Sequence, residues 1–181
     1  MSAPFHPDAP PDKIEKYALR ERERRFLLAR VPDLPVVRTA AITDRYLDGT
    51  RMRLRRMVET LPGATRTYYK LTQKVPAVGG GQGLLTTFYL SREEHEVLER
   101  VPGRELRKER RSAPPFAVDV FAGELEGLVM AEAELETDEE FAALPTPDFA
   151  LADVTADARF TGGSLAVLDA SALSSLLSGY R

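Results

Sequence analysis

Charged residues recur at every second position in five short segments of this chain. In an extended strand, residues i and i+2 point to the same face of a sheet. Each segment would therefore present a stripe of charge from one face of a strand, and the stripes carry both signs. Acidic and basic stripes of this kind are suited to lining a cavity that holds metal ions and a polyanion. The segments are Glu21, Glu23 and Arg25; Arg53 and Arg55; Lys70, Thr72 and Lys74; Lys108 and Arg110; and Glu132 and Glu134.

The composition limits the kinds of protein that this chain can be. Its 181 residues are enough for one domain with a sizeable core. The hydrophobic content of 43% and the charged content of 29% are ordinary for a soluble globular protein. Because the net charge is only -3, no overall positive field favours a nucleic acid or an acidic membrane as partner. With no cysteine, disulfide and thiolate chemistry are excluded.

No segment predicts a membrane span or export. The chain has no apolar run of the about 18 residues that a spanning helix needs. The start, MSAPFHPDAPPDK, lacks the basic and apolar regions of a signal peptide, so we expect a cytoplasmic protein. Residues 1–12 hold four prolines and predict a flexible N-terminal tail, and residues 13–181 predict a single domain.

The elements that would position the stripes are mostly strands. Residues 16–29 could form either a charged helix with i,i+4 ion pairs or an extended segment, on pattern alone. Elsewhere, runs rich in β-branched and aromatic residues, bounded by turn residues, favour strands. The predicted strands are 42–47, 51–58, 66–75, 84–90, 104–111, 116–121 and 127–136.

Three short helices are predicted at the margins of these strands. Ser91 with Glu94, and Thr137 with Glu140, form capping-box patterns, and residues 164–180 are amphipathic at helical spacing. The glycine-rich run at 79–83 lacks the Lys-Ser/Thr of a phosphate-binding loop and favours a hairpin connection. The sum predicts an α+β protein, with an antiparallel sheet, sandwich or barrel flanked by helices.

The order of the charged motifs resembles that of the CYTH superfamily, also called triphosphate tunnel metalloenzymes. The N-terminal signature of that family is Glu-x-Glu-x-Lys, and the later motifs follow here in the family's order and approximate spacing over residues 16–166. These motifs are ERERR (21–25), RLR (53–55), KLTQK (70–74), KER (108–110), DVF.G (119–123), AEAELE (131–136) and DVTADARF (153–160).

The resemblance implies an eight-stranded antiparallel β-barrel, or tunnel, with short flanking helices. Eight strands form a barrel just wide enough for one small ligand. Known members include inorganic, thiamine and RNA triphosphatases and class IV adenylyl cyclases. The implied activity is metal-dependent hydrolysis of the terminal phosphate of inorganic triphosphate or a related organic triphosphate. The partner is then a small-molecule triphosphate, with no nucleic acid or membrane, and the protein is a monomer or a homodimer.

The resemblance also implies roles for the charged residues. Arginine can donate bidentate hydrogen bonds to phosphate oxygens, and hard ions such as Mg²⁺ or Mn²⁺ prefer carboxylate oxygens. The substrate clamp would be Arg53, Arg55, Lys74, Lys108, Arg110 and Arg159, joined by Arg25 and Lys70 on the same faces. The metal would be held by Glu21, Glu23, Glu132 and Glu134, with Asp119 as a candidate support, and Glu21, Glu23 and Glu134 would be catalytic. The outer face would carry the arginines that alternate with these residues along the strands, namely Arg20, Arg22, Arg24 and Arg56.

Three departures from the family pattern keep more than one function open. Arg25 replaces the usual Lys and cannot readily titrate. The family carries acids in two further stretches, where this chain has Leu85 and Thr87 in the first and Ala117 in the second. These replacements remove carboxylates that a second metal would need. A more basic tunnel favours holding a polyphosphate over fast turnover. The alternative is therefore a triphosphate- or nucleotide-binding protein with little or no turnover, and a class IV-type adenylyl cyclase is a third hypothesis.

Overall fold

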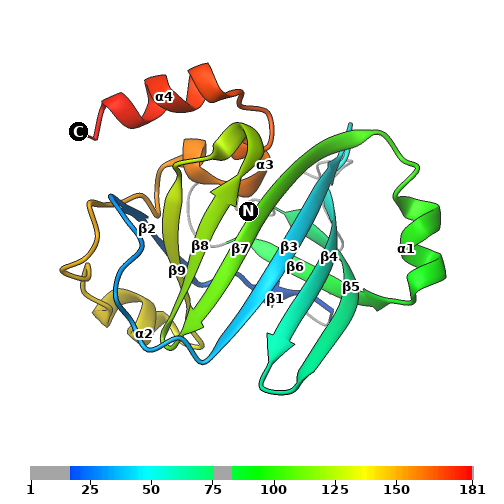
Figure 1. Cartoon of the computed structure of the whole chain (residues 1–181), viewed down its shortest axis with the longest axis horizontal. Helices are drawn as coiled ribbons and strands as arrows, with labels where there is room; N and C mark the ends of the chain where they lie inside the picture. Colours follow the sequence, from blue (N-terminus) through cyan, green and yellow to red (C-terminus); the bar gives the residue numbers. More distant parts are fainter. Residues whose placement is uncertain (1–16, 76–82, 181) are drawn as a thin grey trace, which may run out of the picture.

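One curved antiparallel sheet dominates the computed structural model, which describes residues 17–75 and 83–180 (Figure 1). The strands lie in the order β1-β6-β5-β4-β3-β7-β8-β9-β2-β10. The seven predicted strand segments are confirmed as β3 to β9, and most strands are longer than the sequence indicated. The strands are β1 (Leu19–Arg20), β2 (Glu23–Leu28), β3 (Arg38–Leu47), β4 (Met52–Leu61), β5 (Ala64–Val75), β6 (Leu84–Leu90), β7 (Gly103–Ala113), β8 (Phe116–Ala122), β9 (Val129–Glu134) and β10 (Ala152–Asp153).

The predicted eight-stranded barrel is not confirmed, because the sheet has ten strands and is not closed. Its two end strands, β1 and β10, do not pair with each other. Instead, the chain itself spans the gap between β6 and β9. β1 pairs with β6 and β2 pairs with β9, and only Glu21 and Arg22 separate them. Hydrogen bonds from Glu21 N to Gly83 O and from Leu135 N to Arg22 O, both 2.9 Å, extend the two pairings to this junction.

The segment 16–29, for which helix and strand stayed open, is extended from Leu19 to Leu28 apart from the junction at Glu21 and Arg22. Three consecutive residues, Phe26, Leu27 and Leu28, are at most 3% exposed. A strand between β9 and β10 buries apolar residues on both of its faces, whereas a surface helix buries a single stripe. Burial on both faces therefore outweighs the small gain from i,i+4 ion pairs in a helix.

The two helices with capping boxes form as predicted. They are α1 (Arg92–Leu98), capped by Ser91, and α2 (Asp138–Ala143), capped by Thr137. The prediction of one C-terminal helix is wrong. It is split into α3 (Gly162–Leu165) and α4 (Ala170–Ser178), because Asp169 begins a new helix by accepting a hydrogen bond from Ala172 N at 2.8 Å. No helix in the described part of the chain has both the length and the apolar character to cross a membrane.

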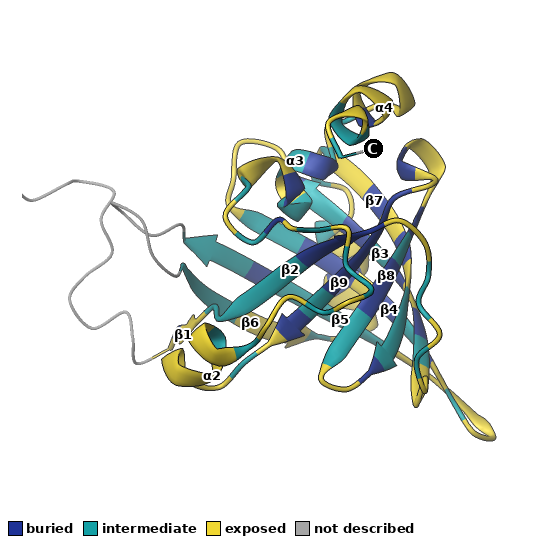
Figure 2. Ribbon diagram, turned by 90° about the vertical axis from the view of Figure 1, so that its left-hand side faces the viewer, coloured by how far each residue is buried: buried dark blue, intermediate teal, exposed yellow. Residues whose placement is uncertain are grey.

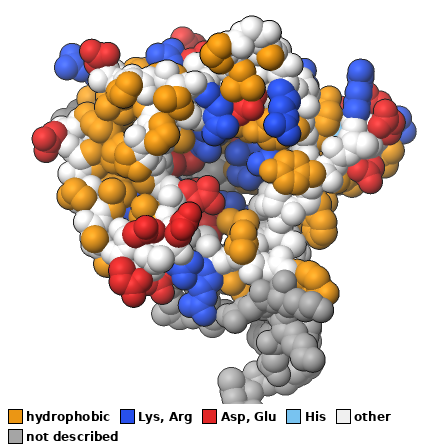
Figure 3. All heavy atoms as spheres, turned by 90° about the horizontal axis from the view of Figure 1, so that it is seen from below, with side chains coloured by type: hydrophobic (Ala, Val, Ile, Leu, Met, Phe, Trp, Pro, Cys, Tyr) orange, Lys and Arg blue, Asp and Glu red, His pale blue; other side chains and the backbone are white. Residues whose placement is uncertain are grey.

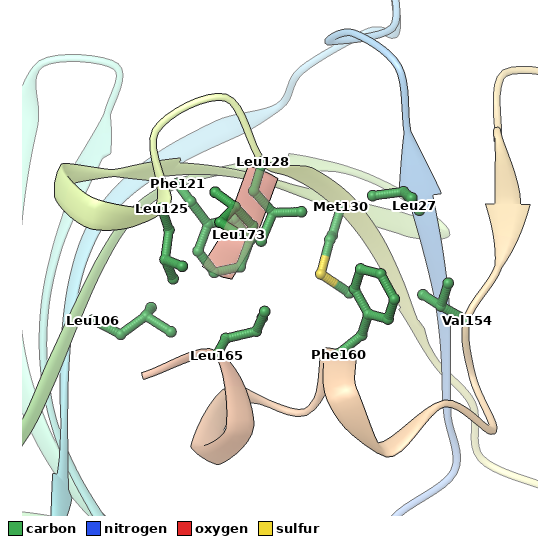
Figure 4. Packing of buried hydrophobic residues seen from close by; sticks show 10 residues of the cluster. All are labelled: Leu27, Leu106, Phe121, Leu125, Leu128, Met130, Val154, Phe160, Leu165 and Leu173. Carbon is green, nitrogen blue, oxygen red and sulfur yellow. The ribbon is translucent and has the colours of Figure 1, made fainter. Parts of the chain in front are cut away.

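Two hydrophobic clusters lie on opposite faces of β2, β8 and β9. The larger cluster joins these strands to the 3₁₀ turn at Ala158–Phe160, to α3 and to α4 (Figure 4). The smaller cluster is built on Phe26, Val118 and Ala131, with Phe116 and Phe149 packed against it. In Figure 2 the buried positions accordingly concentrate along β2, β8 and β9. Because these strands are packed on both faces, their side chains are held in fixed positions.

Two predictions concern parts of the chain that the structure does not describe. The flexible tail, residues 1–12, lies outside the described residues, as do residues 79–82 of the glycine-rich run. The single-domain boundary at residue 13 therefore stays a prediction.

Candidate functional site

A cavity of about 370 Å³ lies within the curve of the sheet, and 12 of its 26 lining residues are charged. In the view from below, Lys and Arg side chains gather around a hollow with acidic side chains beside them (Figure 3). Alternation along each strand directs the stripes into this space, as the sequence predicted. The lining includes eight cationic side chains (Arg25, Arg38, Arg53, Arg55, Lys70, Lys74, Lys108 and Arg110) and four carboxylates (Glu21, Glu23, Glu132 and Glu134).

The structure brings together every predicted site residue except Asp119 and Arg159. Arg159 lies in the 3₁₀ turn, and 62% of its side chain is exposed. Its guanidinium donates to Asp157 at 2.6 Å and to the Tyr180 hydroxyl at 3.3 Å, away from the cavity. Strand alternation does not apply in such a turn, and the neighbouring Phe160 reaches the cavity lining instead.

The residues predicted for the outer face lie there. Arg22 pairs with Asp138 at 2.6 Å. Arg24 donates to the Leu144 carbonyl at 2.8 Å and to Asp153 at 2.5 Å, and so ties α2 and β10 to the outside of β2. These contacts fix the strand whose inner face carries Glu21, Glu23 and Arg25.

The four carboxylates form an acidic wall on β2, β9 and the junction residue Glu21 that precedes β2. Glu23 lies directly opposite Glu134 on the neighbouring strand, and like charges in this arrangement destabilise a sheet. Burial, followed by the charge of Glu132, raises the pKa of Glu23 to about 7. Neither Glu23 nor Glu134 makes a side-chain hydrogen bond to another described residue, although Arg25 Nε lies 3.8 Å from a Glu23 oxygen. A cation at this wall would relieve the repulsion between them.

The other two acidic side chains of this wall are already paired. Glu21 accepts a hydrogen bond from Lys74, and Glu132 accepts one from Arg110. Burial by itself would raise the pKa of Glu132, but Lys108 and Arg110 more than offset it, and the pKa lies well below its usual range. Glu132 therefore stays ionised.

Two buried aspartates hold the cations that β4 and β7 contribute to the cavity. Arg55 donates to both oxygens of Asp44, at 2.6 and 2.7 Å, and Asp44 is 1% exposed. Burial would raise the pKa of Asp44, but Arg55, Arg53 and Lys108 together outweigh it and hold this pKa below its usual range. Sequence reasoning missed Asp44, because it has no charged residue two positions away on its strand. Only the register, which sets Asp44 opposite Arg55, reveals it.

Asp119 lies beneath the cavity, where it is fully buried. Arg110 donates to its two oxygens, each at 2.7 Å, and Lys108 donates to one of them. Both oxygens are therefore engaged by cations. This position fits the predicted supporting role and leaves no free oxygen for a metal.

Arg25, which replaces the Lys of the family motif, is anchored to the C-terminal loop. Its guanidinium donates to the carbonyls of Thr155 at 2.7 Å and Phe160 at 3.3 Å. The Nε atoms of Arg25 and Arg53 are buried and make no hydrogen bond to a described residue, although each lies near a carboxylate, that of Glu23 at 3.8 Å and that of Asp44 at 3.6 Å. Buried donors without a hydrogen bond are unfavourable, so both guanidinium groups have donors to offer an anion in the cavity.

The three positions where the family carries acids do face the cavity. Leu85, Thr87 and Ala117 all line it, and the Thr87 hydroxyl is hydrogen-bonded to that of Thr72 at 3.0 Å. Within the described residues, the cavity's carboxylates are therefore confined to the wall formed by β2 and β9. No three acidic or histidine side chains among them form a preformed metal site. The oxygen donors are still of the kind that Mg²⁺ and Mn²⁺ prefer, and Glu23 and Glu134 are the pair available to hold such an ion.

Several lining residues were not predicted. Tyr68 lies two residues before Lys70 on β5, so extending that stripe toward the N-terminus would have found it. The Lys70 ammonium lies 5.2 Å from the centre of the Tyr68 ring and 5.1 Å from that of Tyr89. Arg38 was missed because β3 begins four residues before the predicted strand, and it pairs with the buried Glu59 at 3.0 Å.

No protein-family model matches the sequence, and no curated protein matches it. Solved structures with a similar fold include one of the hypothetical protein NE1496, with a TM-score of 0.54, 28% identity, and coverage of 82% of this chain and 99% of that chain. A structure of the inorganic triphosphatase NE1496 has a TM-score of 0.54, 25% identity, and coverage of 82% and 95%. The PH1819 protein from Pyrococcus horikoshii OT3, with a TM-score of 0.45 and 16% identity over 66% of this chain and 82% of that chain, is too distant to support an argument.

The fold and the comparisons define the structural class of this chain. Its fold is that of α+β proteins built on a mostly antiparallel sheet with few helices. The resemblance to the CYTH family, which the motifs indicated, is confirmed by the similarity to the inorganic triphosphatase NE1496.

Proposed function

We propose that this protein is a divalent-metal-dependent triphosphatase that removes the terminal phosphate of a triphosphate bound in the charged cavity. The observation that carries the proposal is that eight cationic side chains and four carboxylates line a single cavity. The carboxylates are gathered on one side of it, where Arg25, Lys74 and Arg110 lie beside three of them. A small polyanion with several charges needs such cations, and a pure anion binder has no need of four carboxylates beside them.

The residues of the chain would bind and orient the substrate. Arg55 and Arg110 each commit Nε and Nη2 to a buried aspartate, which fixes the guanidinium plane before substrate arrives. Arg25 and Arg53, whose Nε atoms make no hydrogen bond to a described residue, would donate to phosphate oxygens.

Hydrolysis adds the oxygen of water to the terminal phosphorus and breaks the bond from that phosphorus to the bridging oxygen. The bridging oxygen leaves with the diphosphate, and one proton of the water passes to solvent. When bound beside Glu23 and Glu134, Mg²⁺ or Mn²⁺ would neutralise phosphate charge and lower the pKa of water. Glu21 and Glu132 would support this wall, and Glu21, Glu23 and Glu134 remain the predicted catalytic residues.

A second function is supported by the small number of acids in the cavity. Leu85, Thr87 and Ala117 line it without a carboxylate, and Glu21 and Glu132 are already paired with cations. A protein that binds a triphosphate or nucleotide with little turnover would fit this arrangement. Adenylyl cyclase activity is a weaker alternative, which analysis of the products formed from ATP would test.

Phosphate release from inorganic triphosphate, ATP and thiamine triphosphate tests the proposal, measured with Mg²⁺, with Mn²⁺ and with chelator. We expect metal-dependent release that Glu23→Gln reduces strongly and that the control Glu139→Gln, on the exposed face of α2, leaves unchanged. Tight triphosphate binding without release would favour the binding protein instead. A small-molecule partner, a cytoplasmic location and a monomeric or homodimeric state stay predictions.

A further inference from the structure

A cavity separate from the charged one, of about 410 Å³, lies on the outer face of the sheet and is lined by α1 and the strands β3, β4 and β7. The residues that these strands contribute, such as Leu54 and Glu105, alternate with residues that line the charged cavity, such as Arg55 and Leu106. The two cavities share no lining residue, so the sheet separates them. We call this cavity the outer pocket, and α1 marks its side of the sheet in Figure 1.

Three arginines line the outer pocket from three neighbouring strands. Thr43 on β3 lies opposite Arg56 on β4 and also opposite Arg107 on β7. Arg45 follows Thr43 by two residues and shares its face of the sheet. Since neighbouring strands lie about 4.8 Å apart, the Cα atoms of Arg56 and Arg107 are about 10 Å apart, a span that two long side chains can close around one small ion. Thr43 lines the pocket too and offers a hydroxyl between them.

Most hydrogen-bond donors of these arginines are free. The Arg56 guanidinium makes no hydrogen bond or ion pair with a described residue. That of Arg45 donates to the Val101 carbonyl at 3.3 Å and pairs with no carboxylate in the described part of the chain. Arg107 commits only its Nε, which donates to Glu105 at 2.7 Å. Three guanidinium groups therefore have donors to offer a ligand in one pocket.

The other polar side chains of the outer pocket leave the arginines in excess. Two carboxylates, those of Glu99 and Glu105, also line it, and the second is already paired with Arg107. His95 on α1 lines it as well, is 5% exposed and has its ring centre 4.6 Å from that of Tyr69. Burial lowers the pKa of His95, so at neutral pH its ring is an uncharged polar group. The pocket is thus positive and suited to an anion.

We propose that the outer pocket binds a phosphate group, which the guanidinium groups of Arg45, Arg56 and Arg107 hold beside the Thr43 hydroxyl. The planar fork of arginine donates two parallel hydrogen bonds to phosphate, and the four oxygens of phosphate accept from several forks at once. A phosphate fills only part of about 410 Å³, so free orthophosphate and the phosphate of a small monoester both fit. The inference is independent of the activity proposed for the charged cavity, because it concerns binding on the other face of the sheet.

NMR of the His95 ring tests the proposal, because this ring lines the outer pocket and not the charged cavity. Orthophosphate and glycerol 3-phosphate are each titrated into the protein at constant pH, with sodium chloride holding the ionic strength constant. His95→Gln identifies the resonances of this ring beside those of His6. The phosphate that binds more tightly shows whether the pocket takes the free ion or an ester.

We expect saturable shifts of the His95 resonances with at least one of the two phosphates. We also expect a rise in the pKa of His95, because an anion favours the protonated ring. The charged groups already near this ring are Glu96 and Glu99 on its own helix and Arg56 on β4. A ring that responds no more to either phosphate than to chloride would overturn the proposal.

Three variants place the bound ion. Arg56→Gln removes a guanidinium without a described contact, so the variant should fold normally and raise the dissociation constant about 10-fold or more. Arg111→Gln is the matched control, because Arg111 lies on the same face of β7 but does not line the outer pocket. Lys74→Ala removes a cation of the charged cavity and should leave the His95 titration unchanged. Wild-type affinity in Arg56→Gln, or loss of the His95 response in Lys74→Ala, would overturn the proposal.

Discussion

Replacing Asp44 by asparagine tests whether the buried aspartates hold the cations of the cavity in place. Asp44 is 1% exposed and accepts two hydrogen bonds from Arg55, at 2.6 and 2.7 Å. An asparagine side chain would keep the shape of the aspartate but remove its charge, leaving Arg53 and Arg55 without their counterion. Removing one partner of a buried ion pair costs about 3–5 kcal/mol, a large part of the about 5–15 kcal/mol that stabilises a typical domain.

The assay is urea unfolding with and without inorganic triphosphate. We expect Asp44→Asn to lower the free energy of unfolding by about 3–5 kcal/mol. The matched control is Glu105→Gln, which breaks the exposed pair of Glu105 with Arg107, 2.7 Å apart, and should cost less than about 1 kcal/mol. Triphosphate should restore more stability to Asp44→Asn than to the wild-type protein, since it supplies the missing negative charge.

The dependence on pH provides a second check of the same reasoning. The pKa of Asp44 in the folded protein lies below its unfolded value of 3.8. The contribution of the carboxylate is therefore complete above pH 3.8 and is lost only as the pH falls through the lower, folded value. A loss of less than about 1 kcal/mol in Asp44→Asn at neutral pH would refute the role of Asp44 as the counterion of these arginines.

Three further predictions address other parts of the structure. Glu23→Gln should weaken Mn²⁺ binding at least about tenfold in calorimetry; unchanged affinity would place the ion elsewhere. Arg53→Ala should weaken triphosphate binding by about 1.5–3 kcal/mol, whereas Arg159→Ala, outside the cavity, should not; equal losses would contradict this placement. Because burial lowers the pKa of His95, NMR titration should find it below 6.5 and the free energy of unfolding should fall as the pH drops below 6.5, a slope that His95→Gln should reduce. A His95 pKa above 6.5 would contradict the burial of this ring against Tyr69.

The face on which the charged stripes of the strands lie could be predicted from the sequence alone. In β4 and β5 the alternation of Arg53 and Arg55, and of Lys70 and Lys74, directs these side chains into the cavity, as predicted. Alternation likewise predicted that position 87, where this chain has Thr87 and no acid, faces the cavity. Alternation is a local property of an extended chain, because successive Cβ atoms point to opposite faces whatever the strand pairs with. The capping boxes of α1 and α2 are local in the same sense, since all of their partners lie within one turn.

The tertiary structure alone decided which charges meet. Asp44 faces Arg55, and Asp119 lies beneath Arg110, because of the register between neighbouring strands, which no local pattern encodes. The same is true of Arg159, whose turn directs it away from the cavity. The charged cavity combines residues from segments more than 100 residues apart, such as Arg53 and Gly162. Register, curvature and the closing of α3 over the sheet depend on packing among distant segments, so they are properties of the folded chain and not of any window of its sequence.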